Sequence, residues 1–396
     1  MYPNQVILPG PSPTPQDLIL DLPEVPDSPT TEVVTDLLTP TEEVLVVEQV
    51  MVPPTHPMIT RSHLGEGALF VEAEANITLD EIGDFSTPDP DTYEKLVYIL
   101  DQKNILQNPL YLAQWNGVSE WGEVTRGLPL TNPPFLDRTL LKARNPPKVE
   151  FTHGHEDIVD ISNTKATFEQ EMLIYKSFVF DPEILQQLKK KAMGDGVLKR
   201  CTSFEVLTAL MWRVRTQSLR LHPDQQVRLY FPVDARSILD PKLPKDYFGN
   251  AITNMSCQCS ASEMLDSPLS STIEKIQRSI KMVTDDYVKS TIDFLEDPKS
   301  FQHHSSTTYL SSWSSLRLSS IDFGWGEPFF AGPTKLTLVI ENPTKLIVVV
   351  WVLFLSHGKD NKGINLILGL PASSMKIFEA LIEMQTKFKK PLSARL

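Results

Sequence analysis

Three short stretches of this chain hold residue types that enzymes use for chemistry. Cys257-Gln258-Cys259 offers two thiols, but no second ligand pair follows at zinc spacing, so we expect no metal site. Gly194-Asp195-Gly196 is a weak nucleotide-binding signal, because it follows an expected helix and not a strand. Asp322-Phe323-Gly324 also occurs in protein kinases, but the H-R-D-type loop, the V-A-I-K-type lysine and the Gly-rich loop of kinases are missing. None of the three stretches identifies a reaction on its own.

The stretch IDFGWGEPFF, residues 321–330, places a tryptophan between two glycines. Gly324 and Gly326 allow backbone turn geometry that other residues resist. Asp322 precedes the turn, where its carboxylate can cap backbone N–H groups or pair with a distant cation. The stretch therefore predicts a structural turn, and the elements around it must show what the turn holds in place.

Composition indicates a globular protein of two or three domains. The chain has 396 residues, of which 41% are hydrophobic and 22% charged, and its net charge of −13 argues against nucleic acid as a partner. Residues 1–60 contain nine acidic residues, no Lys or Arg, and twelve of the 32 prolines. We expect this segment to be irregular.

Cysteine usage and segment hydropathy indicate a cytoplasmic protein. An odd, sparse set of three cysteines implies no disulfide framework and a reducing compartment. The acidic start matches neither a signal peptide nor a transit peptide. The longest apolar run, Leu346 to Leu355, is too short to span a bilayer. We therefore expect no membrane span. The chain is also expected to be a monomer.

Helices and strands alternate along the second half of the chain. Asp181-Pro182 predicts a helix start that runs toward Gly194, and Thr202 with Glu205 predicts a capping box for a second helix. Alternating apolar residues from Val227 to Val233 predict a half-buried strand. Further helices are expected over 273–283 and from Ser373 or Ser374, and before Leu128 we expect a strand over 69–73 and a short helix or turn over 78–82. This interleaving indicates a mixed α/β fold.

Two segments look different from their surroundings. Leu128–Val149 contains five prolines, which predicts an extended connection between domains. PTKL occurs at Pro333–Leu336 and again at Pro343–Leu346 within a strongly apolar span, which predicts two strands or an insertion.

Five spaced motifs in this chain resemble those of the plant BAHD acyltransferases. Asp322–Gly326, preceded by Ser311-Ser312-Trp313, resembles the second signature of that family. The other agreeing stretches are Thr202–Glu205 with Trp212-Arg213, Val233–Arg236, and Tyr247–Asn250. LGEGALFVEAEAN, WGEVTRGLPL and PPFLDRTLLKARNPPKVEF are most similar to hydroxycinnamoyl transferases, and in particular to the group that transfers feruloyl to omega-hydroxypalmitate.

The resemblance implies a two-domain, CoA-dependent acyltransferase fold with a channel between the domains. We expect an acidic irregular segment (1–60), a remnant of the N-terminal domain (61–130), a crossover linker (131–175) and a C-terminal domain (176–396). Acyl-CoA would enter one face of the channel and the alcohol acceptor the other, with no metal or redox cofactor. The resemblance further implies that Asp322 pairs with Arg236 near the CoA side and that Trp325 fills space behind the channel. Phe323, Gly324 and Gly326 belong to the same motif, and candidates for the channel or CoA region are Ser203, Trp313 and Asn250.

The general base that the resemblance implies is missing. In the family a histidine in an H-x-x-x-D motif takes the acceptor proton, a task that suits a pKa near neutrality. Here Asn108–Gln114 is followed by six residues and then by Trp121, so the strand and loop that carry the motif are absent. His153 and Asp157 have the same spacing, but they lie after the Pro-rich linker, where we expect an exposed loop.

The other histidines offer no replacement, so we name no catalytic residue. His357 is expected at a strand end, and no acid lies at useful spacing from the remaining ones, which are His56, His63, His222, His303 and His304. The opening strands of the family are also absent before Leu64, and residues 335–351 look inserted. A misassembled gene model, a splice variant and a relic copy remain alternatives.

Two functions follow from these observations. The first is transfer of a hydroxycinnamoyl group such as feruloyl from CoA to a long-chain omega-hydroxy acid or fatty alcohol, impaired in this chain. The second is an inactive family member that binds acyl-CoA or a partner protein without turnover. The missing histidine segment favours the second for this chain, and the C-terminal motifs favour the first for its lineage.

Overall fold

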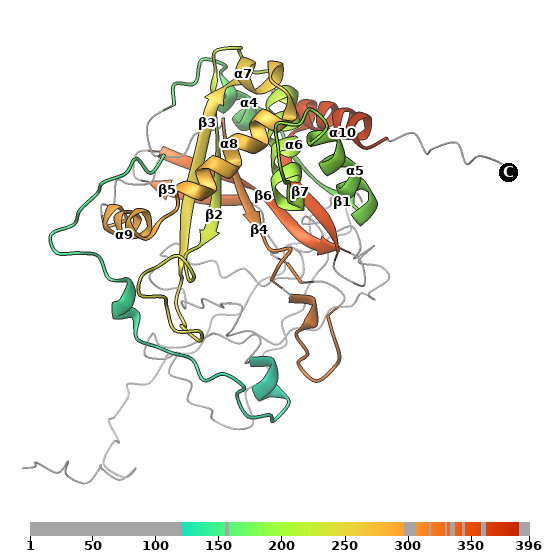
Figure 1. Cartoon of the computed structure of the whole chain (residues 1–396). Coiled ribbons are helices and arrows are strands. Elements are labelled where there is room, and N and C mark those ends of the chain that lie inside the picture. The colour runs from blue at the N-terminus through green and yellow to red at the C-terminus, as the bar shows by residue number, and fades with distance from the viewer. Residues whose placement is uncertain are drawn as a thin grey trace, which may run out of the picture. The chain divides into compact units, whose positions relative to one another are not determined.

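The computed structural model describes the C-terminal two thirds of the chain in most detail (Figure 1). The described residues are 121–154, 158–296, 306–316, 318–328, 331–332, 337–342, 345–357 and 362–387. The chain divides into two units, Met1–Glu48 and Gln49–Leu396, and every element below belongs to the second unit. The expected irregular segment 1–60, the elements expected at 69–73 and 78–82, and nearly all of the expected remnant 61–130 lie outside the described residues.

Helices and strands alternate as the sequence predicts. The elements are η3 (Arg138–Leu141), α4 (Thr164–Gln170), β1 (Leu173–Phe180), α5 (Pro182–Ala192), α6 (Ser203–Ser218), β2 (Gln226–Asp234), β3 (Ile252–Ser260), α7 (Ala261–Asp266), α8 (Leu269–Met282), α9 (Asp285–Phe294), β4 (Thr307–Ser312), η4 (Leu318–Ser320), β5 (Thr337–Asn342), β6 (Lys345–His357), β7 (Gly363–Pro371) and α10 (Ala372–Thr386). None of the described helices is long and apolar enough to cross a membrane.

One mixed sheet organises these elements. Within the described residues its strand order is β1-β7-β6-β4-β2-β3, and β5 pairs with β6 outside this path. β4 runs parallel to both of its neighbours, β2 and β6, whereas the other pairs are antiparallel. The predicted mixed α/β fold is confirmed.

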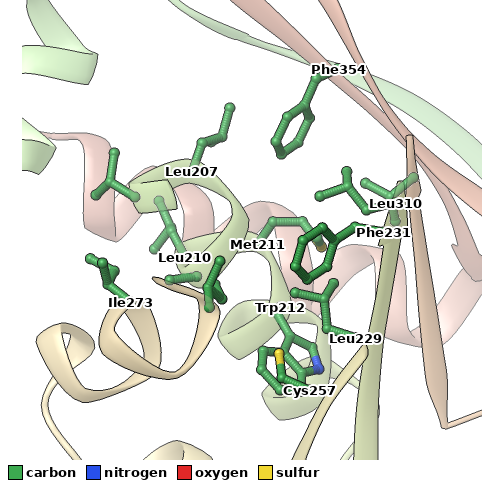
Figure 2. Packing of buried hydrophobic residues seen from close by; sticks show 14 of the residues in the cluster. Leu207, Leu210, Met211, Trp212, Leu229, Phe231, Cys257, Ile273, Leu310 and Phe354 are labelled. Atoms are coloured by element: carbon green, nitrogen blue, oxygen red, sulfur yellow. The ribbon is translucent and has the colours of Figure 1, made fainter. Parts of the chain in front are cut away.

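Helices α5, α6, α8 and α10 cover one face of the sheet (Figure 1). The central helix α6 is buried over most of its length, and Trp212 is fully buried. Figure 2 shows Met211 and Trp212 of α6 packed toward Leu229 and Phe231 of β2. Apolar burial of this extent is the main favourable contribution to folding, because it removes hydrocarbon surface from water.

Strand β2 is buried on both faces, so the prediction of a half-buried strand is wrong. Residues 227–231 are all buried, including Arg228 and Tyr230, which alternate with the residues that face the helices. Tyr230 packs against Tyr309 of β4 on that second face, with ring centroids 5.7 Å apart. The alternating pattern predicts burial of the apolar face only. The second face is buried as well, but its residues, such as Arg228 and Tyr230, are polar or aromatic and give no apolar signal.

Local capping signals set the helix starts. The Asp181 side chain accepts the N–H of Ile184, and Thr202 with Glu205 forms both bonds of a capping box, as predicted. Helix α10 begins at Ala372, and its own N-cap residue makes no side-chain bond. The distant Glu171 instead accepts from the N–H and hydroxyl of Ser373, at 2.9 and 2.8 Å.

The two unusual segments also take the expected conformations. Residues 126–154 and 158–163 are irregular apart from η3, and the span predicted as linker (131–175) also contains α4 and the first residues of β1. In the span with the PTKL repeats, β5 and β6 form an antiparallel pair in which Asn342 of β5 faces Lys345 of β6, and Lys345 belongs to the second repeat. The prediction of two strands there is confirmed.

Candidate functional site

The turn at residues 322–326 is built around the Asp322 carboxylate. Its Oδ1 accepts the backbone N–H of Gly324 at 2.7 Å and that of Gly326 at 2.9 Å. Both glycines have positive φ, 108° and 99°, a conformation that residues with a Cβ rarely adopt. These N–H bonds, first that of Gly324, hold the pKa of Asp322 below its ordinary value.

Residues 121–126 dock directly against this turn. Residues 121–125 are helical, and Arg126 Nη1 lies 3.7 Å from Asp322 Oδ2. The rings of Trp121 and Phe323 meet edge to face, with centroids 5.3 Å apart. At Gly122 a Cβ would come 2.8 Å from the backbone oxygen of Asp322, so the close approach requires glycine. The turn therefore ties residues 121–126, which precede the linker, to the segment after β4.

Asp322 does not pair with Arg236 in the described structure, which corrects our expectation. Arg236 instead bonds within its own loop, with Nη1 3.2 Å from Asp234 Oδ1 and Nη2 3.2 Å from the Gly249 oxygen. The expected position of Trp325 is also wrong, since its side chain is 95% exposed. Because the capped turn directs both glycine N–H groups inward to Asp322, the residue between them is held at the surface.

The other three candidates lie on separate elements. Ser203, the first residue of α6, receives a hydrogen bond from Lys189 Nζ at 3.3 Å. Trp313 follows β4 and donates from its indole to Ser311 Oγ at 3.1 Å, and Asn250 Oδ1 accepts the N–H of Ile252 at 3.2 Å. Each of these contacts is local, so no described contact joins the three residues into one site.

The linker is anchored on α9 by buried polar side chains. Asp293, whose side chain is 1% exposed, accepts the backbone N–H of Arg144 at 2.7 Å and that of Lys148 at 2.7 Å. Ser290 Oγ accepts the N–H of Glu150 at 2.9 Å and that of Phe151 at 3.3 Å. Backbone N–H groups that leave water need such acceptors, so these bonds fix the path of the linker.

His153 belongs to the same anchor and is 5% exposed, so the expected exposed loop is wrong at this residue. Its Nε2 lies 3.0 Å from Ser290 Oγ and its Nδ1 lies 3.3 Å from Thr291 Oγ1. Burial lowers the pKa of the imidazole. Asp157, the acid of the H-x-x-x-D spacing, lies outside the described residues. Because both ring nitrogens face hydroxyl groups of α9 and the ring is buried, His153 is not presented to an acceptor hydroxyl.

The two other described histidines do not take that role either. His222 is exposed, and its Nδ1 accepts the N–H of Asp224 at 3.2 Å within one turn. His357 is the last residue of β6, as predicted. Neither arrangement places an imidazole beside a buried orienting acid, which is the usual arrangement for a general base.

The cysteines of Cys257-Gln258-Cys259 lie in the core. They are side by side on the helix-facing side of β3, and burial raises the pKa of each thiol to about 12. A thiol that stays protonated is a poor metal ligand. Within the part of the chain that the structure describes, no group of three or more metal-binding side chains comes together.

Comparison with known proteins decides the family. A family model described as the Transferase family matches residues 111–385. The chain belongs to the plant BAHD acyltransferase family. It is similar to omega-hydroxypalmitate O-feruloyl transferase of Arabidopsis thaliana, with 44% identity over 344 residues that cover 79% of this chain and 73% of that protein.

Two further known proteins are similar to this chain over part of its length. Fatty alcohol:caffeoyl-CoA acyltransferase of Arabidopsis thaliana is 40% identical over 349 residues, covering 81% of this chain and 78% of that protein. The crystal structure of vinorine synthase aligns with a TM-score of 0.48 and 18% identity over 67% of this chain. That alignment spans 58% of the vinorine synthase chain, so less than two thirds of the solved structure is matched.

Sequence reasoning missed the residues that make the long-range contacts of this BAHD chain. Arg126 and Gly122 belong to the WGEVTRG stretch, which contributed to the family resemblance. Nothing in that stretch indicated that the two residues contact Asp322. Asp293 and Ser290 gave no signal, because an acid and a serine on an amphipathic helix are usually solvated. The five prolines of the linker predicted its extended form but not its docking.

Proposed function

We propose that the chain is an acyl-CoA-dependent O-acyltransferase for long-chain hydroxyl acceptors. It transfers a hydroxycinnamoyl group such as feruloyl from CoA to a long-chain omega-hydroxy acid or a fatty alcohol. The observation that carries this proposal is the similarity to two relatives, each over about four fifths of the chain. Their names share a hydroxycinnamoyl group as the acyl part and a long aliphatic hydroxyl compound as the acceptor.

The reaction requires a proton acceptor at the attacking oxygen. The acceptor hydroxyl attacks the thioester carbonyl, its proton passes to a base, and the C–S bond breaks to release CoA. This chain has no H-x-x-x-D segment before Trp121, and both nitrogens of His153 are bonded. Since loss of a general base costs about 10²–10⁴ in rate, we expect slow turnover.

A second function, binding of acyl-CoA without turnover, is favoured by the same observation. Among the described histidines none is placed as a base. The turn at residues 322–326 is nevertheless fully formed. Asp322 accepts the N–H groups of both glycines and lies beside Arg126. A chain of this kind would keep a ligand surface while it lacks the group that moves the proton.

We further propose where CoA meets the described residues. Helix α6 begins at Ser203, with Lys189 beside it and the exposed Lys190, Lys199 and Arg200 nearby in sequence. Cations close to a helix N-terminus favour phosphate groups, which CoA carries. Trp313 and Asn250 stay candidates for the channel wall.

The remaining expectations are proposals of the same kind. The chain acts as a monomer in the cytoplasm, and acyl-CoA is its co-substrate, with no metal or redox cofactor. Three cysteines without disulfides among the described residues support a reducing compartment.

Release of CoA thiol tests the proposal directly. The protein is incubated with feruloyl-CoA and omega-hydroxypalmitate, and parallel reactions replace the acceptor by a fatty alcohol, by shikimate or by nothing. Acceptor-dependent release with the two long-chain compounds supports the transferase, whereas release with shikimate alone overturns the acceptor class. Thermal stabilisation by feruloyl-CoA without any release supports the second function. Sequencing the transcript on both sides of Trp121 shows in addition whether an H-x-x-x-D segment precedes it.

A further inference from the structure

His153 joins the linker to α9 through both of its ring nitrogens. The imidazole lies between the rings of Tyr287 and Phe294, with centroids 5.0 Å away in each case. Nε2 faces Ser290 Oγ at 3.0 Å and Nδ1 faces Thr291 Oγ1 at 3.3 Å. The ring is therefore enclosed by the helix that also binds the linker backbone.

The hydrogen-bond partners determine which nitrogen carries the proton. Ser290 Oγ accepts two linker N–H groups, those of Glu150 and Phe151, which occupy both of its lone pairs. Its own proton must go to His153 Nε2. Thr291 Oγ1 donates its proton to the Tyr287 oxygen at 2.9 Å, so it can only accept from His153 Nδ1. The network thus requires the neutral tautomer with the proton on Nδ1.

A second proton on the ring has no place in this network. On Nε2 it would point at Ser290 Oγ, whose lone pairs already hold the linker. Burial also disfavours the charged ring, because water no longer solvates it. Protonation therefore breaks the contact that holds Glu150 and Phe151.

The charged groups on the surrounding elements make no described contact that would stabilise a positively charged His153 ring. The linker carries Arg144, Lys148 and Glu150, α9 carries Asp285, Asp286, Lys289 and Asp293, and β2 carries Arg228 and Asp234. Glu150, the nearest described carboxylate in sequence, pairs with Lys148 at 2.8 Å, and Asp293 is occupied by Arg144 and Lys148. Within the described residues no contact joins a carboxylate to the ring, and residues 155–157 lie outside them.

We propose that His153 is a pH-dependent latch, which holds the linker on α9 while it is neutral and releases it when it is protonated. The pKa is lower in the folded chain than its ordinary value of 6.5. The contribution to docking is thus complete above 6.5 and declines as the pH falls below that value toward the folded pKa. The latch is separate from the proposed reaction, since it concerns only the position of the linker.

Amide hydrogen exchange of the full chain tests the latch, with rates corrected for the intrinsic effect of pH. Peptides that cover residues 144–154 are followed at about pH 7.5 and about pH 5, and a peptide from β7 serves as an internal control. In the wild type we expect linker protection to fall severalfold at the lower pH, because the released linker takes up a proton that the docked linker excludes. Protection in β7 is expected to stay constant.

Two variants separate the charge from the packing. His153→Gln stays neutral and can accept from Ser290, so its linker protection should change little with pH. His153→Phe keeps the ring contacts but loses both hydrogen bonds, so protection should be low at both pH values. An equal fall in the wild type and in His153→Gln overturns the latch, as does a wild type whose linker does not respond.

A titration of the wild type keeps the test decisive if the variants do not fold. The His153 ring is assigned by NMR through its contacts to the Tyr287 ring. We expect the Nδ1–H tautomer at neutral pH and a midpoint below 6.5, in step with the linker amides. A midpoint above that value, or the opposite tautomer, contradicts the proposal.

Discussion

Arg144 reaches Asp293 twice, through its backbone N–H at 2.7 Å and through its guanidinium Nε at 2.6 Å. The same carboxylate accepts the N–H of Lys148 at 2.7 Å. One buried acid on α9 therefore fixes both ends of a short piece of linker. The linker is thus part of the packed C-terminal body at this point, although its sequence is that of an extended connection.

Replacing Asp293 by asparagine should destabilise the fold by about 3 kcal/mol, because three donors would face a group with only one oxygen. The control is Asp286→Asn, which changes an exposed acid on the same helix. Urea denaturation of both variants measures the difference in the free energy of unfolding. Equal midpoints would mean that the hydrogen bonds of Asp293 do not stabilise the fold.

The lowered pKa of Asp293 should also make the stability of the fold sensitive to acid. Burial raises the pKa of its carboxyl, but the N–H bonds of Arg144 and Lys148 and the guanidinium more than offset this, so the folded pKa lies below 3.8. The stabilisation is complete above that ordinary value and disappears as the pH falls through the folded pKa. Denaturation at a series of acid pH values should show this loss in the wild type and not in Asp293→Asn.

Gln225 should be sensitive to substitution, because it is fully buried and uses both ends of its amide. Its Oε1 accepts the N–H groups of Ile161 and Ser162, and its Nε2 donates to the Val159 oxygen. Gln225→Ala leaves these groups without partners and should cost about 2–3 kcal/mol. Gln217→Ala, an exposed position on α6, is the matched control, and thermal unfolding of the two variants is compared.

Gly154 and Gly196 form a pair that separates crowding from backbone strain. Both have left-handed φ, 70° and 75°, which costs an alanine about 1 kcal/mol. A Cβ at Gly154 would lie 2.0 Å from Ser256 Oγ, whereas nothing lies within 4 Å at Gly196. Gly154→Ala should therefore lose about 1–3 kcal/mol more than Gly196→Ala in chemical denaturation. Equal losses would show that the linker does not approach β3 this closely.

The partner of Asp322 can be tested with two double-mutant cycles. The structure predicts that Arg126→Ala and Asp322→Asn are coupled, because their side chains lie 3.7 Å apart. Arg236→Ala and Asp322→Asn should instead be additive, since Arg236 bonds to Asp234 and Gly249. Stability of the single and double variants is measured by denaturation. Coupling in the Arg236 cycle alone would restore the pairing that the family resemblance implied.

Signals that act within a few residues were sufficient to predict much of the fold. Asp181 before Pro182 and the Thr202–Glu205 capping box placed two helix starts correctly, because both ends of each bond lie within one turn. The start of α10 was placed one or two residues late, since its cap comes from the distant Glu171. The family resemblance predicted the acyltransferase group, which the comparisons confirm.

The candidate site was less predictable, because its contacts join distant segments. Asp322 was recognised as a turn residue, but its ionic partner was misassigned to Arg236. His153 was expected in an exposed loop because Ser290, 137 residues further along the chain, could not be seen to enclose it. Trp325 was expected to be covered, since a large aromatic in a motif suggests packing, whereas the capped turn holds it in solvent.

The most direct test of the account is CoA release from feruloyl-CoA with omega-hydroxypalmitate, measured for the wild type beside His153→Gln. We predict slow or undetectable release at equal levels in the two proteins, together with binding of feruloyl-CoA by both. Rapid acceptor-dependent release that disappears in a folded His153→Gln protein would contradict the account, because His153 would then act as the base.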